Sequence, residues 1–101
     1  MATSLIHGID GIDLEVADDL RARLVSDLRS EGTYRIETAG WMRCDLSGVA
    51  VLLSAAKTAS ALGATLEIDL PSDGLVETCM RGCGLDPALL RGAGAVASAQ
   101  L

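Results

Sequence analysis

Apolar residues recur with two different periods along the chain, and these periods predict its helices and strands. A helical period follows Asp13, which is a plausible N-cap, and ends at Gly32, a typical helix terminator. Its polar side carries charged residues, including the neighbouring carboxylates Asp18 and Asp19. We expect its apolar side to face the core through Leu14, Val16, Ala17, Leu20, Leu24, Val25 and Leu28.

Alternation of apolar and polar residues marks the strands. It is clearest from Ala64 to Leu70, where we expect Leu66, Ile68 and Leu70 on one face and Thr65, Glu67 and Asp69 on the other. A second strand is predicted from Tyr34 to Glu37, with an extension through Trp41 and Met42 left open. A third, short strand is predicted from Ser4 to Ile9, before a turn at Asp10-Gly11.

The segment from Val49 to Leu62 is apolar or small on nearly every side, which predicts a buried helix that ends at Gly63. A loop from Cys44 to Gly48 is expected to lead into it. After Pro71, either Ser72 or Asp73 can cap a helix that runs to about Arg81, with its inward side formed by Leu75, Val76, Cys79 and Met80. A short helix is expected from Leu85 to Leu90, followed by a fraying tail over 91–101.

Strands and helices therefore alternate, and this order is typical of βαβ units. The predicted fold is α/β: a small mixed, mostly parallel β-sheet of about four strands with α-helices packed on it. The length of 101 residues, without a repeat or a linker, indicates a single domain over 1–101.

Charge and cysteine usage narrow the function classes. The formal net charge of -6 disfavours nucleic acid and anionic membranes as partners, because both attract clustered Lys and Arg. No apolar stretch reaches the length of a membrane helix, and the first ten residues do not resemble a signal peptide, so we expect a cytoplasmic protein. The odd count of three cysteines, Cys44, Cys79 and Cys83, predicts free reduced thiols.

The residues that could take part in catalysis do not have the spacing or the partners that a known type of active site requires. A zinc site needs about four ligands, whereas Cys44 is distant in sequence from Cys79 and Cys83, and His7 is the only histidine. Nothing pairs His7 with a cysteine nucleophile, and Asp18-Asp19 fits a solvated helix face. A phosphate-binding Gly-Lys-Ser/Thr motif is missing. We therefore expect a protein that is not an enzyme and that uses neither a metal nor another cofactor.

An ordered set of short motifs resembles the STAS family, whose members include anti-sigma factor antagonists. The set covers the chain from about Leu5 to Leu90. It consists of the loop Asp45-Leu46-Ser47-Gly48, the turn and strand from Gly63 to Ile68, Pro71-Ser72, and Gly84-Leu85-Asp86. The chain departs from the family pattern at Leu46, where a hydroxyl residue is usual, and at Arg43 and Cys44, where the family tends to be more apolar.

The resemblance implies a non-enzymatic switch that docks a partner protein. By analogy with the family, Ser47 is the position that a cognate serine kinase phosphorylates, and a phosphate there would lie at the positive end of a helix dipole. The implied partner is a GHKL-type serine kinase or an anti-sigma factor, or another signalling kinase. The expected docking residues are Trp41, Asp45, Leu46, Ser47 and Gly48.

Four of these five residues also have a simpler interpretation. Ser47 can be an ordinary N-cap, Asp45 can close a capping turn, Gly48 can allow close packing, and Trp41 can belong to the core. A second function also stays open, because STAS-like domains serve as constitutive cytosolic subunits of lipid-transport ABC complexes. In that role the loop hydroxyl supports contact with the ATPase without being phosphorylated.

Overall fold

The computed structural model describes residues 3–6, 9–29, 32–71 and 73–92. Its strands form two small sheets, and every strand pair in this part of the chain is parallel. The larger sheet has the order β1-β3-β5 and consists of β1 (Thr3–Ser4), β3 (Thr33–Glu37) and β5 (Thr65–Asp69). The smaller sheet pairs β2 (Gly11–Ile12) with β4 (Arg43–Cys44). The helices are α1 (Ala17–Asp27), α2 (Leu46–Leu62), α3 (Leu75–Gly82) and α4 (Ala88–Gly92).

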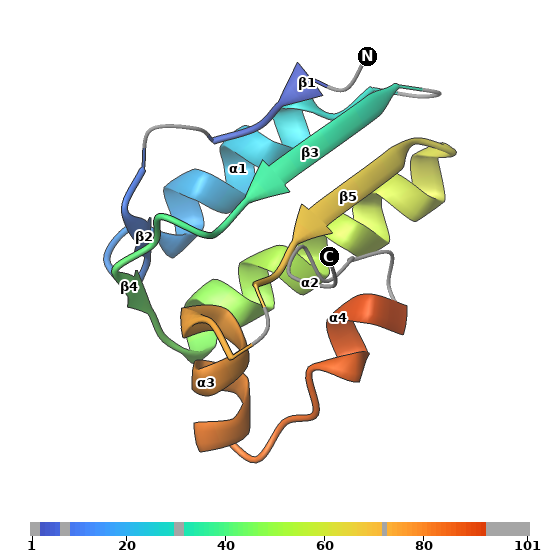
Figure 1. Cartoon of the computed structure of the whole chain (residues 1–101). Coiled ribbons are helices and arrows are strands. Elements are labelled where there is room, and N and C mark those ends of the chain that lie inside the picture. Colours follow the sequence, from blue (N-terminus) through green and yellow to red (C-terminus); the bar gives the residue numbers. More distant parts are fainter. Residues whose placement is uncertain (1–2, 7–8, 30–31, 72, 93–101) are drawn as a thin grey trace.

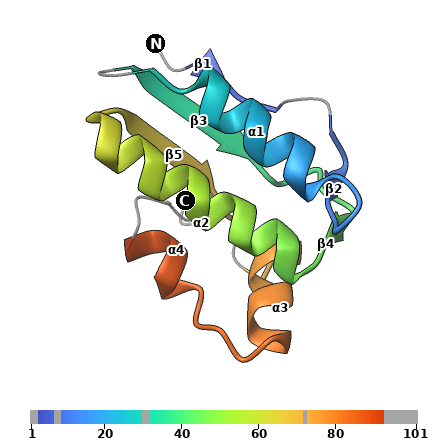
Figure 2. The same ribbon diagram turned by 180° about the vertical axis from the view of Figure 1, so that it is seen from behind.

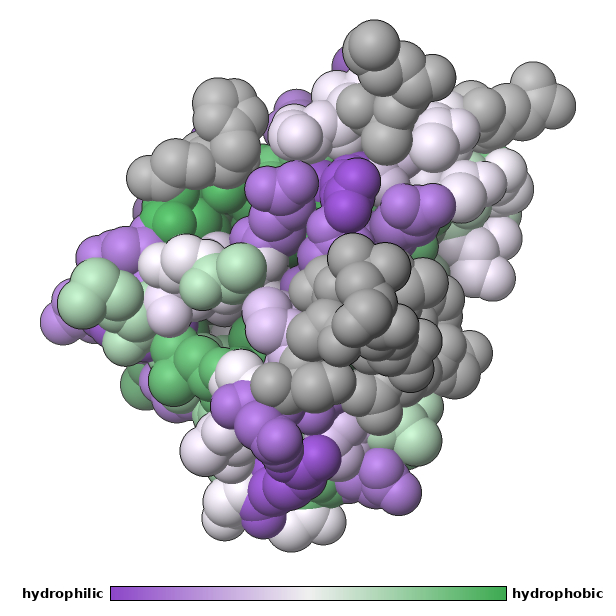
Figure 3. All heavy atoms as spheres, in the orientation of Figure 1, coloured by the Kyte–Doolittle hydropathy of each residue, from purple (hydrophilic) through white to green (hydrophobic). Residues whose placement is uncertain are grey.

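Helices α1 and α2 lie side by side against one face of the three-stranded sheet (Figures 1 and 2). The core lies between these layers, and it contains Ile36 and Ile68, which are paired in register on β3 and β5. The opposite face of the sheet carries Arg35, Glu37 and Glu67, and Figure 3 shows hydrophilic side chains gathered there. This one-sided arrangement confirms the α/β class, with helices packed on a parallel sheet.

The prediction that the segment from Val49 to Leu62 forms the most buried helix is confirmed. Helix α2 buries Gly48, Val49, Val51, Leu52, Ala55, Ala56 and Ala59. Alanines in the middle of the helix allow its backbone to lie close to the sheet. The helix ends at Gly63, whose left-handed conformation (φ 72°) costs glycine little.

The predicted turn at Asp10-Gly11 is wrong, because Gly11 begins strand β2. Gly11 has φ 141°, and a Cβ built on it would lie 1.9 Å from the carbonyl oxygen of Arg43. The glycine therefore allows β2 and β4 to approach each other closely. The Asp-Gly dipeptide, which is typical of turns, gives no indication of this contact between distant strands. The partner strand of β2 contains Cys44, which we had expected in a loop, while β3 ends at Glu37 without extending to Trp41 and Met42.

The start and end of α1 also differ from the prediction. The N-cap is Val16, which makes no side-chain capping bond, and the helix ends at Asp27 rather than at Gly32. Asp13 accepts hydrogen bonds from the backbone N–H of Glu15 and from the Arg43 guanidinium instead. As a consequence Leu14 lies before the helix and is exposed, and Val25 is exposed on its outer side, although both were predicted to face the core.

Asp69 lies on the predicted face of β5, the same face of the sheet as Arg35, and its side chain is buried there in an ion pair with Arg35 at 2.5 Å, while its carbonyl oxygen accepts a hydrogen bond from Thr38. Two further expectations were wrong in detail. The N-cap of α3 is Gly74 rather than Asp73, and Leu75, at the start of that helix, is exposed rather than inward-facing. The predictions for His7, for Ser72 and for the chain beyond Gly92 concern residues outside the described ranges.

None of the helices in the described part of the chain combines the length and the hydrophobicity that a membrane crossing requires.

Candidate functional site

The segment between β4 and α2 is organised by the carboxylate of Asp45. Asp45 is the N-cap of α2, and its Oδ1 accepts a hydrogen bond from the backbone N–H of Gly48 at 3.2 Å. Its Oδ2 accepts a second bond, at 3.1 Å, from the backbone N–H of Leu14. The capping interpretation of Asp45 is therefore correct, and the same side chain also holds the segment before α1 against the start of α2.

Ser47 is the second residue of α2 and lies within its first turn, two residues after the cap. The ordinary N-cap interpretation of Ser47 is therefore wrong, and so is the expectation that the helix begins at Val49. Ser47 lines an open groove of about 300 Å³ between α1 and α2. On the α1 side, the groove is lined by Leu14, Asp18 and Arg21, among others.

Large apolar side chains are exposed around this segment. The exposed fraction is 76% for Leu14, 80% for Met42 and 55% for Leu46. The backbone bond from Leu14 to Asp45 places Leu14 beside the start of α2, and Met42 lies directly before β4. We call these three residues, together with Ser47, the loop surface. Sequence reasoning found Leu46 and Ser47 but missed the other two, because Leu14 fitted a helical core period and Met42 fitted an extended strand.

Trp41 lies in the core, with only 6% of its surface exposed. Its backbone N–H donates to the carbonyl oxygen of Thr38 at 3.0 Å. Of the two interpretations of Trp41, the core position is the one that the structure shows, so the side chain supports the loop from beneath.

Gly48 is explained by close packing. A Cβ at this position would lie 2.7 Å from the carbonyl oxygen of Ile12 and 3.3 Å from the sulfur of Cys44. The start of α2 therefore lies directly on the β2-β4 pair, which fixes the position of Ser47 relative to the small sheet.

The three cysteines lie closer together than their sequence spacing suggested. Helix α3 packs against β4, and the thiol of Cys44 interacts with that of Cys79, which in turn interacts with Cys83. Burial, with a smaller effect from Cys79, raises the pKa of Cys44 to about 12. Burial also raises the pKa of Cys79. All three cysteines are free, and the raised pKa values of Cys44 and Cys79 make these two thiols poor nucleophiles.

Ion pairs from Arg43 join β4 to the chain before α1. Its guanidinium donates to Asp10 at 2.8 Å and to Asp13 at 2.6 Å, and the hydrogen bond with Asp10 is the main cause of its raised pKa. Sequence reasoning had noted Arg43 only as a departure from the family pattern. Within the described ranges, no cluster of three or more potential ligands is placed to hold a metal ion.

Comparison with known proteins identifies a domain family. Residues 10–91 match a family model described as "Mlab, STAS domain", whereas no curated protein and no solved structure matches the chain. The matched region runs from the residue before β2 into α4, so it includes the loop, the small sheet and the buried helix α2. Since this region is most of the chain and its fold is a parallel sheet with helices on one face, the protein belongs to the STAS domain family.

Proposed function

We propose that this protein is a non-enzymatic interaction switch of the anti-sigma factor antagonist type. In this proposal a GHKL-type serine kinase, or another signalling kinase, docks on the loop surface, and phosphorylation of Ser47 releases it. The observation that carries the proposal is the position of Ser47, which lines an open groove together with the exposed Leu14 and directly follows the exposed Leu46. STAS domains are generally non-enzymatic, and the high pKa of Cys44 agrees with a role without catalysis.

The loop surface has the character of a protein-binding patch. Burying exposed Leu and Met side chains against a partner lowers the free energy of the complex, because apolar surface is removed from water. The flexible Met side chain can adapt its shape to different surfaces. Asp45 and Gly48 contribute by fixing the backbone beneath these side chains. Trp41 contributes by supporting the loop, so we do not include it among the contact residues.

A phosphate on Ser47 would be attracted by some neighbouring groups and repelled by others. The N-terminus of α2 and the guanidinium of Arg21, which lines the same groove, favour a negative charge. Arg21 makes no ion pair within the described part of the chain, and side chains on a helix lean toward its N-terminus, which is the Ser47 end of the groove. The carboxylates of Asp18 and Asp45 oppose the charge. The phosphate would therefore add charge and bulk to the loop surface without refolding the domain.

The test combines phosphorylation with binding. The protein is incubated with the kinase encoded beside its gene and with ATP, and the phosphorylated residue is mapped by mass spectrometry. We expect phosphate on Ser47, none on Ser47→Ala, and retained kinase binding by Ser47→Ala. We expect Ser47→Asp to bind at least about tenfold more weakly, because a new charge in a desolvated contact is unfavourable.

The matched control is Ser60→Asp, which adds the same charge to an exposed position farther along α2. It should bind as the unmodified protein does. Phosphate found only elsewhere, or equal binding by Ser47→Asp and Ser60→Asp, would contradict the switch.

The alternative is a constitutive subunit of a lipid-transport ABC complex, and one observation favours it. Leu46 stands where a hydroxyl is usual in the family and is exposed, so the loop surface is more apolar than a phosphorylation site requires. Under this alternative, the chain would co-purify with an ABC ATPase, and no kinase would modify it. Replacing Leu46 with Asp would then abolish that association.

A further inference from the structure

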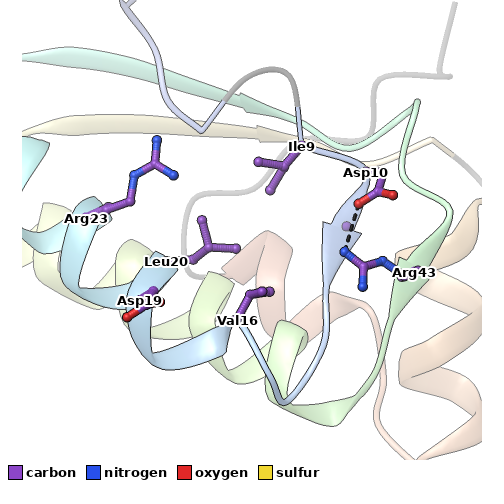
Figure 4. A pocket seen from close by; sticks show the side chains of 8 residues that line it. Ile9, Asp10, Val16, Asp19, Leu20, Arg23 and Arg43 are labelled. Atoms are coloured by element: carbon purple, nitrogen blue, oxygen red, sulfur yellow. Dashed lines mark hydrogen bonds and ion pairs between the residues drawn. The ribbon is translucent and has the colours of Figure 1, made fainter.

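A second concave site lies on another side of α1, between this helix and β2. It is an open pocket of about 440 Å³, within the range of about 300–1,000 Å³ typical of small-ligand sites. Three aliphatic side chains, those of Ile9, Val16 and Leu20, point into it (Figure 4). The pocket therefore offers an apolar wall rather than a purely polar surface hollow.

The charged groups around this wall are not equivalent. Asp10 turns toward Arg43, and these two groups neutralise each other at 2.8 Å. Arg23 forms no ion pair with any described residue, although Asp19 stands one turn before it on the same helix. Figure 4 shows the reason: the Arg23 guanidinium extends toward the strands, whereas the Asp19 carboxylate points the other way. Arg23 is thus the cation at this pocket that is available to a ligand.

We infer that this pocket binds a small aliphatic carboxylate, with the aliphatic body against Ile9, Val16 and Leu20 and the carboxylate on Arg23. A guanidinium presents paired N–H donors that match the two oxygens of a carboxylate. The apolar body supplies the remaining affinity by burial. The net charge of -6 opposes any anion, but charges farther away than about 8 Å are largely screened at physiological ionic strength, so the local groups decide.

This site is independent of the proposed docking function. The pocket is lined by positions 19, 20 and 23 of α1 and by its N-cap, Val16, whereas positions 17, 18 and 21 of α1 and Leu14, which precedes the helix, line the groove that contains Ser47. Within α1, the two sets lie on adjacent stripes of the helix. A ligand in the pocket would leave the loop surface open, and the inference stands or falls without reference to phosphorylation.

The experiment titrates the protein with octanoate and follows backbone amide signals by NMR. Octanol and octylamine serve as neutral and cationic probes of the same length. We expect saturable shifts at Gly11, Val16 and Leu20 with octanoate, weaker binding of octanol and the weakest binding of octylamine. Arg23→Gln should weaken octanoate about tenfold and leave octanol unchanged, because it removes only the charge-assisted contact.

Arg29→Gln is the control, because it removes the same charge from an exposed residue that does not line the pocket. It should bind octanoate as the unmodified protein does. A second variant, Val16→Ser, tests the apolar wall and should weaken octanoate and octanol alike. The inference is overturned by shifts that do not saturate or that lie outside the pocket, by octanol binding as tightly as octanoate, or by equal effects of Arg23→Gln and Arg29→Gln.

Discussion

The carboxylate of Asp45 connects three segments of the chain, because it is part of the loop after β4, caps α2 and holds Leu14. Asp45→Ala removes both hydrogen bonds, so we expect a loss of about 1–2 kcal/mol in the free energy of unfolding. Asp45→Asn keeps a capping oxygen and should lose less. Urea denaturation of both variants measures the difference. Equal losses would mean that the carboxylate acts through its charge and not through these bonds.

Cys44 makes stability depend on pH in the alkaline range. Its thiol ionises near pH 9 when exposed and near pH 12 in the fold, so between these values the unfolded state binds fewer protons. Stability contributed by the buried thiol is therefore complete below about pH 9 and declines as the pH rises toward 12. Cys79 acts in the same direction.

We expect Cys44→Ala to flatten the fall in unfolding free energy between about pH 8 and pH 10.5. Ser60→Ala, at an exposed position on α2 that carries no thiol, should leave the slope unchanged. Urea denaturation at several pH values provides the measurement. A slope that is identical in Cys44→Ala and the unmodified protein would show that this thiol is not shielded from water.

Among the elements, the β2-β4 pair depends most on a single residue. Gly11→Ala would place a Cβ against the Arg43 backbone at an unfavourable φ, so we expect a loss of more than about 3 kcal/mol or a failure to fold. Gly40→Ala is the matched control, because nothing lies within 4 Å of its added Cβ, and it should change stability by less than about 0.5 kcal/mol. Thermal unfolding compares the two. A mild effect of Gly11→Ala would mean that the small sheet adapts easily.

The sequence predicted some elements better than others for physical reasons. Helix α2, β3 and β5 are long or strictly periodic, so their local pattern was sufficient. The β2-β4 pair has only two residues per strand, and its formation depends on contacts between positions more than 30 residues apart. The role of Asp13 also depends on a distant residue, because its side chain bonds Arg43 instead of capping a helix.

For the molecule as a whole, both proposed binding sites lie beside the same helix. Helices α1 and α2 cover one face of the three-stranded sheet, and the groove that contains Ser47 and the pocket both adjoin α1. The motif order in the sequence identified the loop from Asp45 to Gly48. It did not identify Leu14, Met42 or the cysteine cluster, because these are brought to the site by the packing of separate segments.

The core position of Trp41 has a practical consequence. It is the only tryptophan of the chain, and it lies beneath the segment that leads to the loop surface. Its indole is shielded from water in the folded protein and becomes hydrated on unfolding. The wavelength of its fluorescence emission therefore distinguishes the two states without a label. Because the reporter is four residues from Asp45, a binding event that shifts this segment would alter the same signal. The fluorescence of Trp41 can therefore report both the unfolding of the chain and the binding of a partner.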